Sequence, residues 1–383
     1  MRHCLRTTFL SVLACALLVG ARAATAVDHV VYERDGVRHR VQGRVEVEAQ
    51  DGGLLVMDRA GKLWTITAEE KQQHTTDEIP FAAHTPEEIG RTLLEELPDG
   101  FQVHTTAHYV ILYDTSRSYA RWCGTLLERL YGTFNNFWKR KGFELVEPEL
   151  PMVAVVFAER ENFRRYMQAD IGRSSSIVGY YNLINNRVAM YDLTGVQRDR
   201  VAGQRERSRA EINKILARPE AGMTVATIVH EATHQIAFNC GLQRRLADVP
   251  FWLSEGVAMY FETPNLASSG GWRGIGKINP SRLSRFRSYQ SERGPDSLRE
   301  LLRTDERLQN SEGVLEAYAE SWALVHFLLK RYPDEFVEYM QMLSQKTPLV
   351  RSTPEERLEE FEQIFGNLDR LDREFVTQMR KLR

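Results

Sequence analysis

Two histidines four residues apart, in a stretch that is otherwise mostly apolar, constrain this chain more than any other feature of its sequence. Residues 225–240 show the pattern of a largely buried helix that Gly241 closes, and His230 and His234 lie on it. Because a helix completes a turn in about 3.6 residues, both imidazoles leave the same face, one turn apart. Imidazoles in an apolar helix need polar partners. The spacing therefore favours a shared metal ion over two solvated surface histidines.

Glu231 comes directly after the first histidine and completes a His-Glu-x-x-His motif. Its carboxylate is offset from the two imidazoles, so it can face a metal-bound water rather than the metal itself. Zinc lowers the pKa of bound water to about 7, and a neighbouring carboxylate can then take a proton from that water. The motif is short enough to arise by chance, so its meaning depends on whether the chain also supplies a third ligand.

The third ligand of such a site has one strong candidate and one weaker one. A catalytic zinc ion usually takes three protein ligands and keeps one position open. Glu255 lies 21 residues after His234, in an apolar helix that Pro250 starts and Pro264 stops. That separation allows a loop and an antiparallel return, which would bring the carboxylate to the imidazoles. Cys240 is the alternative ligand, but the first helix would then have to end early.

The two segments together resemble a known group of enzymes. A His-Glu-x-x-His motif followed about twenty residues later by Trp-Leu-x-Glu-Gly-x-Ala is similar to the gluzincin metallopeptidases, which include thermolysin and aminopeptidase N. The chain looks especially like the exported bacterial peptidase-MA-like proteins, and the resemblance covers roughly residues 101–345. This resemblance implies a Zn²⁺ ion held by His230, His234 and Glu255, with Glu231 as general base and later proton donor.

The resemblance also implies roles for residues outside the two motifs. Tyr318 lies some sixty residues after Glu255, where aminopeptidase N relatives carry the tyrosine that stabilises the oxyanion, although a core tyrosine would also suit its apolar helix. Glu262 matches an acid that could orient a ligand histidine, and the alternative is a surface acid at a helix end. We expect His326 to be a core histidine rather than a ligand.

Several family features are missing from the sequence. It has no Gly-x-Met-Glu-Asn motif, whose glutamate grips the amino terminus of the substrate in aminopeptidase N. Residues 187–192 are the expected counterpart of the edge strand that corresponds to this motif, and they lack that glutamate. Aminopeptidase specificity is therefore not supported, although an extended substrate could pair with the strand near residues 188–191. Met259 occupies the position of an aspartate in the thermolysin pattern, so that part of the thermolysin site does not carry over.

The pattern of the remaining segments predicts an α+β protein. Residues 27–80 are expected to form a small all-β domain, because short strands and turns succeed one another from 28 to 68. Residues 69–100 are polar, and we expect a linker with a short helix over 81–100. Residues 101–383 would form the zincin-like domain, with a small mixed sheet, the active-site helix and a mostly helical C-terminal part.

The N-terminal segment predicts export from the cell. Residues 1–26 have the pattern of a secretory signal peptide, with a basic start, a 12-residue apolar run over 9–20 and small residues at two cleavage patterns. The run is too short to span a bilayer, so we expect no stable membrane insertion after cleavage and a periplasmic or secreted location. Cys123 and Cys240 would remain, either as a disulfide or as two buried thiols.

The overall charge argues against nucleic acid as a partner. The chain has 50 basic and 52 acidic residues, a formal charge of −2, and no long basic stripe. We predict zinc-dependent hydrolysis of a peptide or protein substrate. One alternative is a zinc-containing envelope-binding protein without catalysis, whose binding element would be the N-terminal unit. Another is an amidase that acts on cell-wall peptide. Activity on casein and on wall fragments would separate these possibilities.

Overall fold

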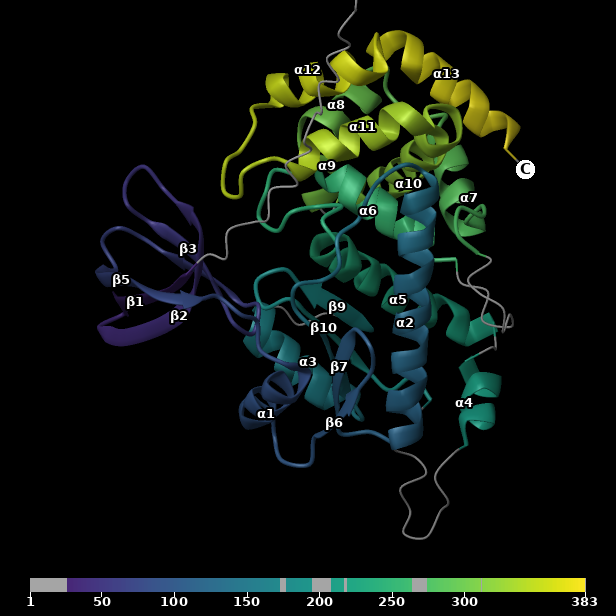
Figure 1. The fold of residues 1–383 in the computed structure, drawn as a ribbon. Coiled ribbons are helices and arrows are strands. Elements are labelled where there is room, and N and C mark those ends of the chain that lie inside the picture. Colours follow the sequence, from purple (N-terminus) through teal and green to yellow (C-terminus); the bar gives the residue numbers. More distant parts are fainter. Residues whose placement is uncertain are drawn as a thin grey trace, which may run out of the picture.

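The computed structural model describes residues 26–172, 177–194, 208–216, 219–263, 274–310 and 312–382. The protein is a mixed α+β molecule with a small β region at the N-terminus and a helical C-terminal part, as the sequence predicts (Figure 1). The expected signal peptide lies outside the described residues apart from Ala26. Within the described ranges, no helix has the length and apolar character needed to cross a membrane.

The N-terminal region is an antiparallel sheet that stands to one side of the rest of the molecule in Figure 1. Its strand order is β4-β3-β2-β1-β5, and alternate side chains such as Val30, Tyr32 and Val56 form its small core. The strands are β1 (Ala26–Arg34), β2 (Val37–Glu48), β3 (Leu54–Asp58), β4 (Leu63–Ile66) and β5 (Lys71–Pro80).

Strand β5 lies within residues 27–80, the expected all-β domain, but past the short strands and turns recognised over 28–68, in a stretch that the sequence marks only as polar. It pairs antiparallel with β1 at the edge of the sheet, and none of its residues is buried. An edge strand without a buried face has no apolar alternation, so the sequence pattern gives no sign of it. The expected short helix is α1 (Pro86–Glu96), which starts with a capping box between Thr85 and Glu88.

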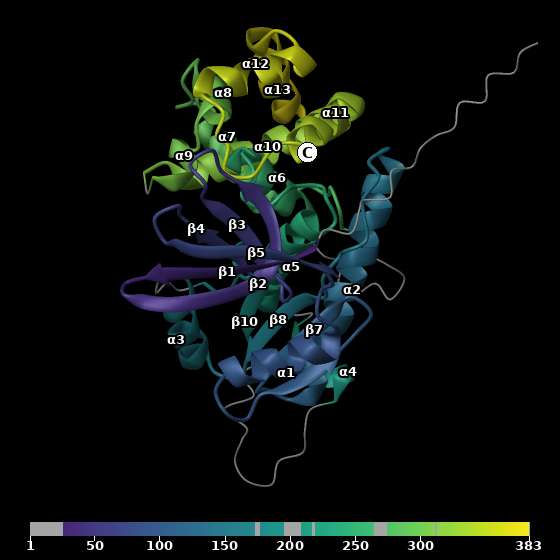
Figure 2. The same ribbon diagram turned by 60° about the vertical axis from the view of Figure 1, so that its left-hand side comes forward.

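A second sheet lies in the central part of the chain, in the order β6-β7-β8-β10-β9. Helices α1 and α3 cover one face through side chains such as Val110 and Val153, and α2 and α5 cover the other through Ile111 and Ala154 (Figure 2). The elements are β6 (Gln102–Thr105), β7 (Tyr109–Tyr113), α2 (Arg117–Arg140), β8 (Met152–Phe157), α3 (Arg160–Ile171), β9 (Gly179–Asn182), β10 (Arg187–Tyr191), α4 (Arg209–Leu216) and α5 (Pro219–Asn239).

Strands β9 and β10 form an antiparallel hairpin, and β10 does not lie at the edge of the sheet, where residues 187–192 were expected. Strand β10 pairs with β8 on one side and with β9 on the other, so it is an interior strand. The edge of the sheet on this side is β9, and the opposite edge is β6. Sequence reasoning placed the edge at residues 187–192 because it could not show that β10 would add parallel to β8 and leave β9 outermost.

The C-terminal part is built from helices that pack on one continuous core. Buried side chains from Tyr109 to Met379 form a single cluster that joins this part to α2 and α5. The helices are α6 (Phe251–Phe261), α7 (Pro280–Tyr289), α8 (Ser297–Arg303), α9 (Glu306–Gln309), α10 (Val314–Arg331), α11 (Pro333–Ser344), α12 (Pro354–Phe365) and α13 (Leu368–Lys381).

Candidate metal centre

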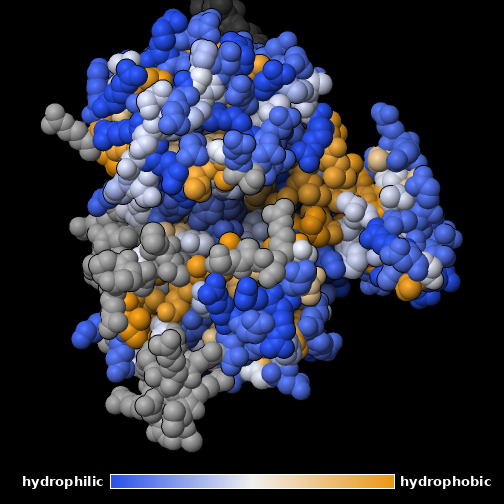
Figure 3. All heavy atoms as spheres, turned by 180° about the vertical axis from the view of Figure 1, so that it is seen from behind, coloured by the Kyte–Doolittle hydropathy of each residue, from blue (hydrophilic) through white to orange (hydrophobic). Residues whose placement is uncertain are grey.

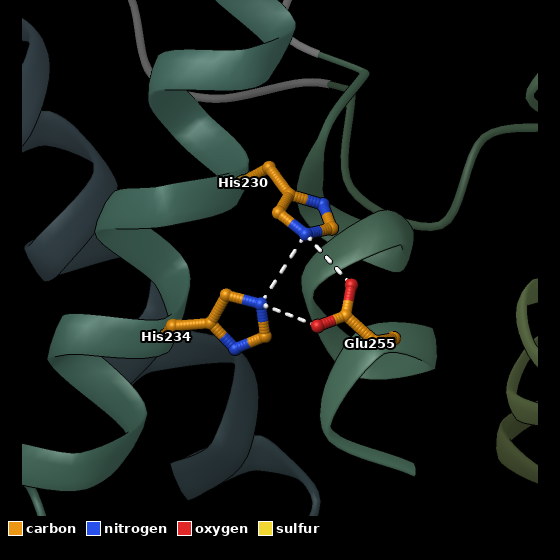
Figure 4. Close-up of side chains that lie close together, drawn as sticks. All are labelled: His230, His234 and Glu255. Carbon is orange, nitrogen blue, oxygen red and sulfur yellow. Dashed lines mark hydrogen bonds and ion pairs between the residues drawn. The ribbon is translucent and has the colours of Figure 1, made fainter. Parts of the chain in front are cut away.

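Helices α5 and α6 bring together the three residues that the sequence predicts as metal ligands. His230 and His234 extend from one face of α5, and Glu255 reaches toward them from α6 (Figure 4). One ligand atom from each residue lies within 4.8 Å of the other two. His230 Nε2 is 3.1 Å from Glu255 Oε2, His234 Nε2 is 3.3 Å from Glu255 Oε1, and the two Nε2 atoms are 3.2 Å apart.

Helix α6 is fixed at its start and along its length. The backbone N–H of Phe251 donates to Asp305 Oδ1 at 2.9 Å, which satisfies one of the free N–H groups of the first turn. Next to the ligand, Gly256 lies against α10, and a Cβ at this position would stand 2.4 Å from Val325 Cγ2 and 2.8 Å from the Ser321 carbonyl oxygen. The glycine therefore permits the close helix contact that positions Glu255.

His230 is oriented by a buried carboxylate at the end of α6. Its Nδ1 lies 3.2 Å from Glu262 Oε2, while Glu262 Oε1 accepts from Asn279 Nδ2 at 2.8 Å and from Arg282 Nε at 3.2 Å. Burial alone would raise the pKa of Glu262, but His230 and Arg282 hold that pKa below its ordinary value. Glu262 is thus an ionised, buried hydrogen-bond acceptor rather than a surface acid at a helix end.

His234 is oriented by a hydroxyl group that the sequence did not single out. Its Nδ1 lies 3.3 Å from Ser254 Oγ, and that hydroxyl donates to Gln243 Oε1 at 3.1 Å. Because the single hydroxyl proton goes to Gln243, the serine oxygen is left to accept from the Nδ1–H of His234. No periodicity marks Ser254, Gln243, Asn279 or Arg282 as parts of the site, since their partners are set by tertiary packing.

The charges of the three residues are strongly coupled. Burial raises the pKa of Glu255, but the two histidines lower it well below its ordinary value, so this carboxyl is ionised. Burial lowers the pKa of His230, while its hydrogen bonds to Glu255 and Glu262 raise it well above the usual range. The local environment therefore favours positive charge beside the carboxylates.

Glu231 lies beside the three residues without joining them. Its Oε2 accepts a hydrogen bond of 2.9 Å from the backbone N–H of Tyr181 on β9, the edge strand. Burial raises the pKa of Glu231 and the two histidines lower it, and the result is a pKa above the ordinary value. A buried carboxyl with a raised pKa has the property required of a proton acceptor and donor.

All five predicted site residues face one cavity of about 970 Å³. Tyr318, on α10, is half-buried in its wall, and the Arg282 guanidinium carbon lies 5.9 Å from its ring centroid. Burial, together with Glu255 and Glu231, raises the pKa of Tyr318, so its hydroxyl remains a hydrogen-bond donor. The structure thus brings the predicted tyrosine into the same cavity as the ligand group.

Other residues considered from sequence lie away from this cavity. His326 is buried against Trp322 and Tyr260, and burial lowers its pKa to about 4, so it is the core histidine that we expected. Cys240 is a free buried thiol outside the ligand group, and Cys123 is also free and buried. Of the open alternatives, the structure therefore supports two buried thiols and gives no role to Cys240 as a ligand.

Part of the chain matches a known family. The family model described as "Protein of unknown function (DUF1570)" matches residues 224–350. This stretch includes both histidines, Glu231, Glu255, Glu262 and Tyr318. No curated protein matches the chain.

Proposed function

We propose that this protein is an exported zinc-dependent hydrolase of peptide bonds, of the gluzincin type and with a zincin-like catalytic domain. One observation carries the proposal: three groups of the type that bind zinc converge from two helices, and a fourth group, Glu231, stands beside them in an open cavity. The signal-like N-terminal sequence supports export.

The donor atoms fit a cation. Glu262 is ionised and can only accept, so His230 donates to it through Nδ1–H and turns Nε2 toward Glu255 and His234. His234 donates to Ser254 through its own Nδ1–H, with the same result. Two imidazole nitrogens and one carboxylate therefore point at each other, and a metal ion bound there would take the place of the proton that the carboxylates now favour on His230. Two nitrogens and one oxygen are the ligand set of many catalytic zinc ions.

The residues of the chain then have distinct tasks. A zinc ion held by His230, His234 and Glu255 would supply Lewis acidity and lower the pKa of water. Glu231 takes a proton from the attacking water and returns it to the leaving amine. The Tyr318 hydroxyl donates a hydrogen bond to the oxyanion that develops on the peptide carbonyl.

The position of β9 suggests how an extended peptide would lie. Its free edge borders the cavity, and the N–H of Tyr181 already bonds to the Glu231 carboxylate. An extended chain can add to a sheet edge through backbone hydrogen bonds. We therefore move the expected substrate contact from residues 188–191 to Gly179–Asn182, because β10 has no free edge.

The test compares the purified protein with Glu231→Gln on casein and on cell-wall fragments. We expect zinc-dependent cleavage of casein that falls by about 100-fold to 10,000-fold in the variant, while bound zinc is unchanged. Cleavage of wall fragments alone would favour the amidase. Zinc binding without cleavage of either substrate would favour the envelope-binding protein, and full activity in Glu231→Gln would refute the assigned mechanism.

A further inference from the structure

The cavity continues past the candidate metal centre along α5, toward the side where the N-terminal sheet lies. Phe238 comes four residues after His234, so it is the next side chain on the same helix face, and it lines the cavity. Its ring stacks on Tyr181 with centroids 6.0 Å apart and an angle of 19° between the planes. An aromatic surface therefore lies next to His234, directly beside the position where a bound peptide would be cut.

Two leucines that also line this end of the cavity have an unusual backbone. Leu246 has φ of 61° and Leu349 has φ of 66°, which is the left-handed region that bulky side chains rarely adopt. The two residues are joined, since the N–H of Leu349 donates to the carbonyl oxygen of Leu246 at 2.8 Å. Backbone strain of this kind persists only where the surroundings impose it, and it gathers at functional sites.

The surroundings of the two leucines impose their strained backbone conformation. Leu246 packs against Leu55, Met57 and Leu63 of the N-terminal sheet. The neighbouring Arg245 donates through Nη1 to the carbonyl oxygens of Gly61 and Leu183, at 2.8 and 3.3 Å. The N-terminal sheet thus supports this wall of the cavity.

The loop that carries Leu349 is held at its other end. The N–H of Ser352 donates to Asp248 Oδ2 at 3.3 Å, and Asp248 is itself held by Arg357. The loop is therefore fixed at the strained leucine itself, through Leu246, and three residues later, through Asp248. A position fixed in this way presents the same side chain to every substrate that enters the cavity.

The leucine at position 349 is not buried despite this support. It is 49% exposed, although the left-handed backbone and the half-exposed apolar side chain both carry a cost. Viewed from behind, apolar surface lies beside the central hollow on the side of the N-terminal sheet (Figure 3). A side chain held in a strained position and left half-exposed beside a candidate active site is placed to contact a ligand.

We propose that Phe238, Leu246 and Leu349 form a subsite that takes a bulky apolar side chain of the substrate on the His234 side of the scissile bond. This inference rests on the proposed function, because it assigns the substrate class of the same site. It also gives the N-terminal sheet a role as a rigid support of the subsite, in place of the separate envelope-binding role considered from sequence.

The test uses Leu349→Gly, because glycine adopts a positive φ without strain and removes only the half-exposed side chain. Val350→Ala is the matched control, since Val350 is the adjacent residue, is 60% exposed and does not line the cavity. Cleavage sites are mapped on a mixture of peptides. We expect a preference of at least about tenfold in kcat/KM for leucine over alanine at one position beside the cut bond.

The ratio of the two rates separates a subsite from a merely structural role. We expect Leu349→Gly to reduce the preference for leucine to less than about threefold, whereas a general loss of structure would lower both rates together. Val350→Ala should keep the preference of the natural protein. A preference that is absent from the natural protein, or unchanged in Leu349→Gly, would overturn the inference while leaving peptide hydrolysis established.

A binding measurement keeps the inference testable if no peptide is cut. Fluorescein-labelled Gly-Gly-Leu-Gly-Gly and Gly-Gly-Ala-Gly-Gly are titrated with zinc-loaded Glu231→Gln protein, with and without Leu349→Gly. Tighter binding of the leucine peptide that Leu349→Gly abolishes would support the subsite even where the proposed hydrolysis fails. Equal binding of the two peptides, with no cleavage, would contradict both proposals.

Discussion

Two buried charged clusters contact α6, one through the backbone N–H of Phe251 and one through Glu255, and they differ in how their charges are matched. Around Arg357, four N–H donors meet four carboxylate oxygens of Asp248 and Asp305 at distances of 2.6 to 3.2 Å. Around Glu255, two imidazole Nε2 atoms and a carboxylate approach one another, and the Nδ1 atom of each ring faces a further polar group, Glu262 or Ser254.

The difference shows why burial and shifted pKa values alone do not identify a functional site. Both clusters are buried, and in both a carboxyl has a lowered pKa, Asp248 in one and Glu255 in the other. The Arg357 cluster is complete in itself and joins α12 to the segments before α6 and α9. The Glu255 cluster gathers acceptors that a cation would complete. The balance of donors and acceptors therefore separates a structural cluster from a candidate metal centre.

The largest expected effect is on stability, from breaking the complete cluster. In Arg357→Met, two carboxylates lose the guanidinium that neutralises them in a buried position, so the free energy of unfolding should fall by about 3–5 kcal/mol. Urea unfolding measures this change. Arg331→Met is the control, because Arg331 bonds to Glu374 at an exposed position, and we expect no measurable loss there. Equal stability of the two variants would show that the Arg357 cluster is not structural.

Removing a hydroxyl at the other cluster should change catalysis and leave the metal in place. We expect Tyr318→Phe to lower kcat about 100-fold to 1,000-fold, because it loses the proposed donor to the oxyanion. Zinc content should stay the same, since Tyr318 is not among the three ligands. Tyr339→Phe, at a buried tyrosine away from the cavity, is the control. Similar kcat values for both variants would assign Tyr318 to the core.

A smaller effect, on zinc affinity, is expected when Glu262, the carboxylate that orients His230, loses its charge. Glu262→Gln keeps the shape of the side chain but removes its charge, so zinc affinity should fall by about 10-fold to 100-fold. Competition with a chelator of known affinity measures the change. Glu374→Gln removes a carboxylate that bonds to Arg331 and Tyr332 elsewhere, and it should leave zinc affinity unchanged. If both variants bound zinc as the natural protein does, Glu262 would have no orienting role.

The smallest expected effect is on the loss of stability at acidic pH. Burial raises the pKa of Asp248, but Arg357 holds it below its ordinary value. A folded-state pKa below the unfolded one means that the ionised group stabilises the fold above the unfolded pKa, and this stability is lost as pH falls through the folded pKa. Unfolding free energies measured from about pH 5 down to about pH 2 should therefore fall less steeply in Asp248→Asn than in the natural protein. An identical slope would contradict this.

The sequence predicts most of the inner part of the candidate site, because helical spacing is local information. His230 and His234 share a face of α5 as their spacing requires, and Gly241, with φ of 77°, lies just past the helix end as expected. The return of Glu255 was also predictable from an apolar helix after a short loop. The helix itself begins earlier than expected, at Pro219 rather than Val225.

The features that sequence reasoning missed depend on contacts between distant segments. Ser254 and Gln243 carry no local signal, and only the packing of α6 on the loop after α5 brings them to His234. The edge strand was wrongly assigned because strand order is a property of the whole sheet. The strained backbones of Leu246 and Leu349 are likewise invisible in sequence, since a leucine gives no local signal of a positive φ.

The most direct test of the central claim is the zinc content of the purified protein beside Glu255→Ala, after both are incubated with zinc and freed of excess metal. If the acceptors at this cluster hold a cation, the natural protein should retain near-stoichiometric zinc and the variant should lose it, because two imidazoles alone hold zinc weakly. A natural protein that retains no zinc would contradict the claim. Zinc retained without Glu255 would contradict the assigned ligand set.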